Sequence, residues 1–435
     1  MWRIAAPMIL SNISVPLLGM VDTGVVGHLD SPAYLGAVAI GGTLFAFLYF
    51  SMNFLRMGTT GIAAQRYGAD DYDGLRIALG QALVVAVIAA FLILVLQVPI
   101  TRLGLELLGG EADIREHAAT YVSIRIWSAP GTLANYALIG WFLGLQNARV
   151  PLAIFLTINL TNIVLDLLFV LVLGMHVDDV ALASVIAEYA GLAVGLVFVG
   201  RALRRHEGHW SLARLTRLGA YRAFFSVNSN LFLRTMVLTF TFAFVTAQGA
   251  RLGPMVLAAN AVLMNFFNLT ALGLDGFAHA AEAMVGKAVG AQDRKALSAT
   301  VQLTLRWSLI FAAAYSLVFL LGGALIIDLL TDLTDVRAAA RDYLPWLILM
   351  PLISAWCFLY DGVFVGMTLA RQMRNIMLVS TFAVFIPAWF LAQPLANHGL
   401  WLALTLFFAS RGIGMHLGFR KAMRGGPGPE VTHHA

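Results

Sequence analysis

The sequence has little of what a soluble protein places on its surface. Only 12% of its 435 residues are charged and 60% are hydrophobic, whereas soluble domains carry about 25% charged residues. A soluble fold cannot bury so much apolar side chain without leaving large exposed patches. The single cysteine, Cys357, excludes an internal disulfide and a thiolate metal cluster. An ordinary soluble enzyme, a disordered chain and a disulfide scaffold are thereby excluded.

Enzyme motifs are also missing. The chain contains no GxxxxGK[ST] loop for ATP phosphates and no GxGxxG, HExxH or GxSxG motif. The segment His206-Glu207-Gly208-His209 has a spacing that suits neither a zinc-binding helix nor a zinc knuckle. We therefore predict that the protein is not an enzyme and needs no metal or organic cofactor. We predict no nucleic-acid partner, because excess arginine in a membrane protein usually marks cytoplasmic loops.

Long apolar runs dominate what remains. The mean hydropathy is +0.82, and a membrane-spanning helix needs about 20 apolar residues. The predicted fold class is an all-α polytopic membrane protein that has the lipid bilayer as its solvent. Twelve spans are expected, at residues 4–26, 36–60, 77–99, 118–146, 150–174, 180–203, 221–248, 255–285, 300–327, 340–366, 374–392 and 398–420.

The basic residues predict the orientation. Most of the 28 Lys and Arg residues fall in loops on one side of this arrangement, which the positive-inside rule assigns to the cytoplasm. Both termini are then cytoplasmic. The first span begins almost at Met1 without a basic segment before it, so we do not expect a removable signal peptide.

An internal repeat divides the chain. Motifs of the first half return 222 positions later: Pro32 returns as Pro254, Gly68 as Gly290, and Gly140-x3-Gly144-x4-Arg149 as Gly362-x3-Gly366-x4-Arg371. Two six-helix bundles related as parallel repeats, with a central cavity between them, are typical of transporters. We predict an N-lobe at residues 1–205, a cytoplasmic linker at 206–220 and a C-lobe at 221–435. The repeated glycines predict close helix packing.

We single out eleven ionisable residues within the predicted spans. They are Asp22, Arg56, Arg125, Asp166, Glu188, Arg234, Asp275, His279, Glu282, Asp361 and Arg411. Each is costly in hydrocarbon and is by default a functional hypothesis. The repeat does not share its acids: Asp22 corresponds to Phe244, and Asp166 corresponds to Ala388. Residues that both halves share are explained by common packing, so acids that occur in only one half are more often functional.

Two of the acids in the first half predict an ion-coupling site. Asn162 and Asp166 are four residues apart and share one helical face. An amide and a carboxylate can hold a proton or coordinate Na⁺, and Asp22 can exchange a proton in the same way. A purely structural hydrogen bond between helices is the alternative. Pro16, six residues before Asp22, is a candidate hinge because a proline inside a helix kinks it.

The second half predicts a polar site of two possible kinds. Arg234 can form a structural ion pair with Asp275 or Asp361, or these residues can contact substrate together with Glu282. Glu188 can face the outer aqueous mouth. Apolar side chains that can form an adaptable wall of the cavity are Met20, Phe45, Met264 and Phe267.

The motifs resemble a known family. They are Val21-Asp22-Thr23-Gly24, Asn162-x3-Asp166, Asn230-Leu-Phe-Leu-Arg234, Gly273-Leu-Asp275 followed by Glu282, and Asp361-Gly-Val-Phe-Val-Gly366. Together they resemble the multidrug and toxic compound extrusion (MATE) family and its DinF-like branch. The resemblance implies cation-coupled export of bulky organic cations. It also implies that Ser184 joins Asp22, Asn162 and Asp166, and that Asp361 matches a cation site of the NorM branch.

The sequence therefore predicts an antiporter of the bacterial inner membrane that works as a monomer. It exports amphipathic, cationic organic compounds in exchange for H⁺, or less plausibly Na⁺. One alternative is a flippase for lipid-linked saccharides, which needs a more cationic cavity. A membrane-embedded enzyme or channel is another, but catalytic and filter-like motifs are missing.

Overall fold

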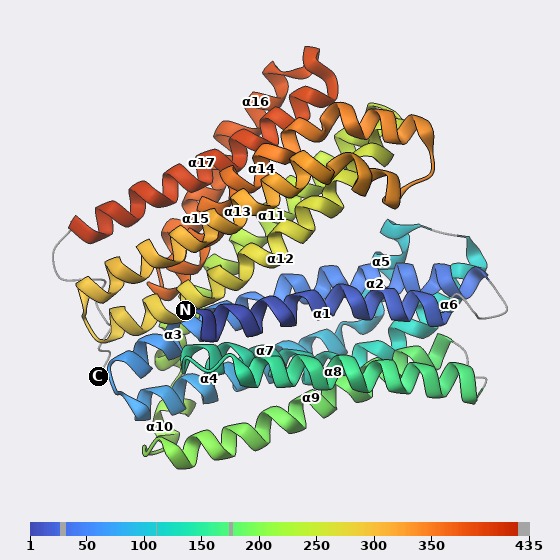
Figure 1. The fold of residues 1–435 in the computed structure, drawn as a ribbon. Helices are drawn as coiled ribbons and strands as arrows, with labels where there is room; N and C mark the ends of the chain where they lie inside the picture. Colours follow the sequence, from blue (N-terminus) through green and yellow to red (C-terminus); the bar gives the residue numbers. More distant parts are fainter. Residues whose placement is uncertain (27–31, 110, 174–176, 425–435) are drawn as a thin grey trace. The chain divides into compact units, whose positions relative to one another are not determined.

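The structure is a computed structural model that describes residues 1–26, 32–109, 111–173 and 177–424. For residues 15–26, 32, 171, 177–179, 212 and 218 it describes the backbone alone. Within these residues, all regular secondary structure is helical (Figure 1). The predicted all-α class is confirmed.

Two series of helices make up the chain. The first comprises α1 (Trp2–Val26), α2 (Pro32–Met52), α3 (Phe54–Gly68), α4 (Tyr72–Val95), α5 (Gln97–Leu108), α6 (Ala112–Arg125), η1 (Ile126–Ser128), α7 (Ala129–Gly144), α8 (Arg149–Asp166), η2 (Leu167–Val172), α9 (Val177–Arg205), α10 (Leu212–Thr216) and η3 (Leu218–Tyr221). The second comprises α11 (Arg222–Arg251), α12 (Pro254–Gly290), α13 (Arg294–Leu330), α14 (Thr334–Gly366), α15 (Ala370–Val379), η4 (Ser380–Phe385), α16 (Ile386–Leu391), η5 (Gln393–Leu395) and α17 (Ala396–Arg424).

The predicted spans all fall on helices. Within the described residues, 10 helices are long and apolar enough to cross a membrane by length and composition. The continuous run α6–η1–α7 and α1 cover the other two predicted spans. Two boundaries were wrong. The third span ends at Val95 rather than 99, where α5 begins a new direction, and the second is interrupted at Asn53 between α2 and α3.

The chain divides into two compact units, and each is described by itself. The N-lobe comprises Ala6–Phe224, and the C-lobe comprises Met1–Ala5 with Phe225–Ala435. The first residues of α1 therefore group with the C-lobe, where the Trp2 ring contacts Phe277, Trp307 and Phe311. The segment predicted as a linker groups with the N-lobe.

The backbone repeats the sequence duplication. Four non-glycine residues have a left-handed conformation at matching turns: Asp70 (φ 53°) with Gln292 (φ 54°), and Gln146 (φ 61°) with Thr368 (φ 55°). The members of each pair lie 222 positions apart. Helices α4 and α13 both begin after an aspartate cap, in which Asp71 accepts from Gly74 N and Asp293 accepts from Ala296 N. The predicted pair of repeated bundles is confirmed.

The repeated glycines mark where helices touch. A Cβ on Gly140 would lie 2.4 Å from the carbonyl oxygen of Arg56, and one on Gly362 would lie 2.1 Å from that of Ala278. Arg56 and Ala278 are themselves 222 positions apart. In each lobe, glycine lets one helix approach the backbone of another, as in small-residue packing of membrane helices.

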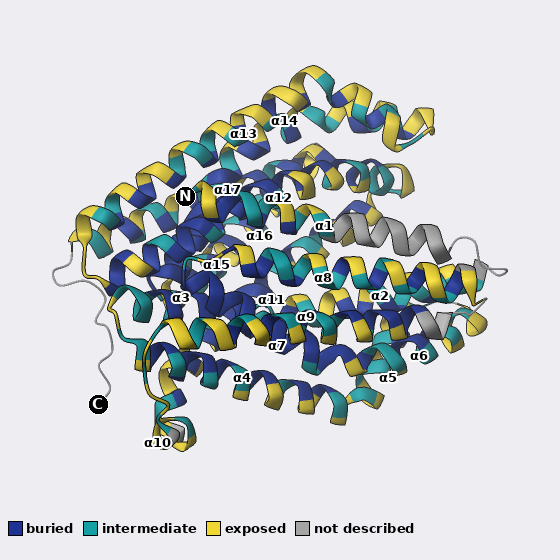
Figure 2. Cartoon of the chain, turned by 60° about the horizontal axis from the view of Figure 1, so that its bottom comes forward, coloured by how far each residue is buried: buried dark blue, intermediate teal, exposed yellow. Residues whose placement is uncertain are grey.

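Burial separates the two faces of the helices. Large aliphatic side chains such as Leu321 (78% exposed) and Leu391 (84%) point outward, while α7 is buried along nearly its whole length (Figure 2). In water such exposure would be unfavourable. A surface of this kind is suited to lipid, which confirms the membrane assignment.

The segment after α9 is held on the N-lobe by α4. Arg76 donates to the carbonyl oxygens of Leu203 (2.6 Å) and His206 (3.0 Å), and Gln81 donates to that of Ala220 (3.0 Å). The His206 ring stacks on Tyr72, with ring centroids 5.2 Å apart. Burial, with the nearby charges of Arg205 and Arg76, lowers the pKa of His206.

Acidification should loosen this segment. Because the pKa of His206 is lowered when its ring is docked, the undocked chain binds the proton more tightly. The docked state is therefore fully stabilised above about pH 6.5, the ordinary histidine pKa, and loses stability as the pH falls. We expect trypsin to cleave at Arg214 and Arg217 about twofold faster at pH 5.5 than at pH 7.5, relative to His206→Phe digested in parallel. An equal ratio at both pH values would contradict this.

Candidate functional site

The N-lobe brings together the predicted polar residues of α8 and α9. Asp166 is the last residue of α8 and is 0% exposed. Asn162, one turn earlier and also buried, donates from Nδ2 to Ser184 Oγ on α9 at 3.3 Å. Asn162, Asp166 and Ser184 form what we call the α8–α9 polar cluster. Ser184, which only the family resemblance had implied, is thus hydrogen-bonded to Asn162.

A π-helical segment follows this cluster directly. The residues after Asp166, Leu167–Val172, form the π-helix η2. Such turns are rare, and they often occur at functional sites because they leave backbone groups without their usual α-helical partners. The π-helical segment therefore begins at the residue directly after the buried carboxylate of Asp166.

Helix α1 contacts α8 about one helical turn before the α8–α9 polar cluster. Asn159, three residues before Asn162, donates from Nδ2 to Ser14 Oγ on α1 at 2.7 Å. The side chains of Pro16, Met20 and Asp22, which carry the predicted hinge, wall and coupling roles, lie outside the described part of the chain. Their helix, α1, is described through Val26.

The C-lobe contains a buried cluster of three charges. Arg234 on α11 and Arg411 on α17 both donate to Asp361 Oδ2 on α14, the latter at 2.8 Å. The three side chains are 7%, 2% and 9% exposed, and we call them the arginine–aspartate cluster. The structure thus pairs Arg234 with Asp361. Sequence analysis noted Arg411 as an in-span charge but assigned it no role, because its partner lies 50 positions away.

Helix α12 contributes three further ionisable residues. Asp275, His279 and Glu282 recur at helical spacing on one face of α12, and His279 Nδ1 lies 3.6 Å from Glu282 Oε2. Asp275 interacts electrostatically with Arg234. Asp275, Glu282 and Asp361 are therefore on two helices, α12 and α14, that pack against each other, and Arg234 on α11 joins them through its hydrogen bond to Asp361.

The aromatic residues predicted as cavity wall lie in the lobe cores. Phe45 is 1% exposed beneath the guanidinium of Arg125, and Phe267 is 3% exposed against Phe358 and Phe408. Met264 packs partly buried against the same C-lobe core. Phe45, Met264 and Phe267 therefore pack the interiors of the lobes.

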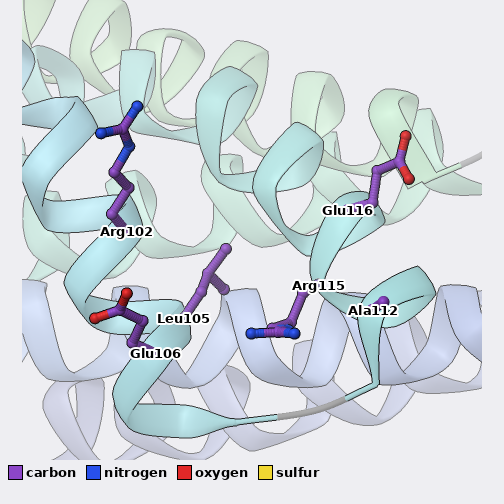
Figure 3. A pocket seen from close by; sticks show the side chains of 6 residues that line it. All are labelled: Arg102, Leu105, Glu106, Ala112, Arg115 and Glu116. Carbon is purple, nitrogen blue, oxygen red and sulfur yellow. The ribbon is translucent and has the colours of Figure 1, made fainter.

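One surface pocket of the N-lobe shares no residue with either cluster. It has a volume of about 320 Å³ and is lined by residues of α5 and α6, namely Arg102, Leu105, Glu106, Ala112, Arg115 and Glu116. Figure 3 shows Arg115 extending toward Leu105 and Glu106. It is lined by two arginines and two glutamates, and it lies where the two short helices α5 and α6 meet.

Comparisons with known proteins agree over most of the chain. The MatE family model matches residues 7–168 and 231–390. DNA damage-inducible protein F of Escherichia coli K12 is 45% identical over 98% of this chain and 93% of its own length. Human multidrug and toxin extrusion protein 1 is 23% identical over 93% of this chain and 71% of its own. A crystal structure of MATE in a bent conformation has a TM-score of 0.87 at 18% identity, and covers 97% of this chain and 94% of the other.

Proposed function

Because the chain belongs to the MatE family, we propose that this membrane transporter is an antiporter that exports amphipathic organic cations in exchange for protons. Asp22 and Asp166 hold the coupling proton, Asn162 and Ser184 tune its affinity, and Pro16 acts as the hinge of α1. The protein works as a monomer in the bacterial inner membrane, with both termini cytoplasmic. Residues 206–220 connect the two six-helix halves.

The observation that carries this proposal is the buried carboxylate of Asp166 beside the Asn162–Ser184 hydrogen bond. A carboxylate in a low-dielectric interior favours its neutral form, because burial penalises the charge. The amide and hydroxyl groups next to it can bond either protonation state. Binding and release of a proton therefore change the local charge without requiring a new set of partners.

The register of α1 and α8 supports a shared site for Asp22 and Asp166. The Ser14–Asn159 hydrogen bond aligns the two helices, which run in the same direction (Figure 1). Position 22 follows Ser14 by about 12 Å of helix, and position 166 follows Asn159 by about 10.5 Å. The two positions therefore have similar depth along the N-lobe.

The C-lobe residues have supporting roles in this proposal. Arg234 and Asp361 brace the lobe from within, and Asp275 and Glu282 line its polar face. A flippase for lipid-linked saccharides needs cationic groups that can receive phosphate. Arg234 and Arg411 both donate to Asp361, and this pairing favours the antiporter over the flippase.

The test is transport of ethidium into inside-out vesicles under a proton gradient alone, or under a sodium gradient alone. We expect the proton gradient to drive ethidium accumulation and ethidium to dissipate the gradient. Asp166→Asn and Asp22→Asn should each reduce proton-driven accumulation by about 100-fold, because a neutral amide cannot carry the proton. Asp70→Asn is the matched control, since Asp70 is exposed at a turn. Wild-type-like transport by Asp166→Asn would refute the site, and transport driven by sodium alone would refute the coupling ion.

A further inference from the structure

A second acid of the N-lobe lies inside the span of α9. Glu188 is about 16.5 Å along the helix from Val177, the first residue of α9, so it lies well inside a helix that is long and apolar enough to cross a membrane. Its side chain is half-buried. A carboxylate at this depth is costly and is expected to have a partner or a function.

The partner of Glu188 is an amide on α7. Asn135 Nδ2 donates both to Glu188 Oε2 and to the Glu188 backbone oxygen, each at 2.9 Å. Asn135 is 1% exposed, and its Oδ1 atom is buried without a hydrogen-bond partner. Gly131 allows this approach, since a Cβ there would lie 3.3 Å from Glu188 Cβ. The carboxylate is thus directed into the lobe.

Three hydroxyl groups lie in series next to the Glu188 carboxylate. Thr132 lies beside both Glu188 and Tyr49, and the Tyr49 hydroxyl is 2.7 Å from Ser128 Oγ. A hydroxyl donates to a carboxylate and accepts from a carboxylic acid, so these groups suit either protonation state. Asn135, in contrast, can donate in both states.

The titratable and charged groups that face Glu188 come from three other helices. They are Arg125 on α6, Tyr49 on α2 and Tyr136 on α7. The Arg125 guanidinium is directed to the Tyr121 hydroxyl and stacks over Phe45 at 5.1 Å. Arg125 therefore interacts electrostatically with Glu188 and also bonds the Tyr121 hydroxyl.

The Asn162–Ser184 hydrogen bond lies between the positions of Glu188 and Asp166. Ser184 is one turn before Glu188 on α9, and its partner Asn162 is one turn before Asp166 on α8. Helices α8 and α9 pack side by side and run in opposite directions (Figure 1). The two acids therefore lie on opposite sides of the Asn162–Ser184 hydrogen bond, separated by about 12 Å along the helices.

We propose that Glu188 is a second proton-carrying residue of the N-lobe, between the Asp166 site and the end of the lobe where α8 begins. This inference rests on the proposed proton coupling. In the step that we infer, the Asp166 carboxylic acid loses a proton and the Glu188 carboxylate gains it. Glu188 then releases that proton to water at the end of the lobe where α8 begins, at Arg149. The proton is the one species transferred, and the polar groups between the acids return to their starting state.

Replacement by glutamine separates this role from a structural one. The Glu188→Gln side chain keeps the shape and can still accept the hydrogen bond from Asn135, so a purely structural residue would tolerate it. A proton carrier would not, because the amide does not titrate. Glu188→Asp keeps the carboxyl group, and Glu116→Gln is the matched control because Glu116 is exposed at the start of α6.

The experiment compares two modes of transport in proteoliposomes. One is uphill ethidium transport driven by a proton gradient, with internal pyranine reporting proton flux. The other is exchange of labelled for unlabelled ethidium with no gradient. We expect Glu188→Gln to reduce proton-driven transport and the pyranine signal at least tenfold, while exchange stays within about twofold of wild type. Glu188→Asp should recover most of the proton-driven rate and shift its pH profile.

Each other outcome decides against the inference. Proton-driven transport by Glu188→Gln at the wild-type rate would show that Glu188 carries no proton. If Glu188→Gln loses both ethidium exchange and proton-driven transport, Glu188 has a structural or substrate-binding role instead. Failure of the wild-type protein to couple ethidium to protons would overturn the proposed function itself, and the wild-type measurement alone reveals that result.

Discussion

Replacing Asp361 with asparagine is expected to destabilise the C-lobe by about 3–5 kcal/mol. Arg234 and Arg411 both direct a guanidinium at the same oxygen of Asp361 in the lobe interior. Removing the carboxylate charge leaves two cations near one another with no counter-ion between them. The aromatic rings of Phe407 and Phe408, 5.2 and 5.8 Å from the Arg411 guanidinium, cannot replace a full negative charge.

The measurement uses the one cysteine of the chain. Cys357 is 0% exposed and lies on α14, one turn before Asp361, so its reaction with a fluorogenic maleimide during heating reports unfolding of this helix. A loss of this size should lower the apparent Tm by about 10 °C. Asp342→Asn removes the same charge from an exposed position of the same helix and should leave the Tm unchanged.

A charge-balanced variant completes the test. Adding Arg234→Met and Arg411→Met to Asp361→Asn removes both orphaned cations, and neutral replacement of a buried ion cluster is often tolerated. The triple variant should recover most of the lost Tm. If Asp361→Asn melts within about 2 °C of wild type, the cluster is not a structural ion pair.

This pairing shows where sequence analysis succeeds and where it stops. Hydropathy and the repeat identified the twelve spans, and the same hydropathy singled out Arg234, Asp361 and Arg411 as charges within them. The partner of a buried charge, however, is set by packing between helices far apart in the chain. Arg411 and Asp361 are 50 positions apart, and Arg234 and Asp361 are 127 apart, so no local period connects them.

In the N-lobe, too, sequence spacing predicted some of the site residues and not their partners on other helices. Asn162 and Asp166 were recognisable because helical spacing places them on one face. Ser184 and Glu188 have the same spacing on α9, and that signal could have joined Glu188 to the site. Its depth and its amide partner could not be predicted, because Asn135 is 53 positions away on a helix whose rotation is set by tertiary contacts. The interruption between α2 and α3 at Asn53 could not be predicted from the repeat either, because the equivalent residue of the second half, Asp275, lies within the unbroken α12.

Substituting alanine for Gly362 tests the packing on which the C-lobe depends. One added methyl group would lie 2.1 Å from the Ala278 carbonyl oxygen, so the backbones of α12 and α14 would have to separate. Overpacking of this kind costs about 1–3 kcal/mol, and contact with backbone rather than a flexible side chain favours the upper end. The Cys357 assay should show a Tm lower by about 6–10 °C.

The control is expected to change stability in the opposite direction. Gly322 on α13 has no heavy atom within 4 Å of a built Cβ, so Gly322→Ala gains helix propensity worth up to about 1 kcal/mol without a clash. Because Gly140 occupies the equivalent position of the other lobe, Gly140→Ala should be as damaging as Gly362→Ala. Equal melting of Gly362→Ala and Gly322→Ala would mean that the repeated glycines are not required for close packing, and the duplication would then need another physical reason to preserve them.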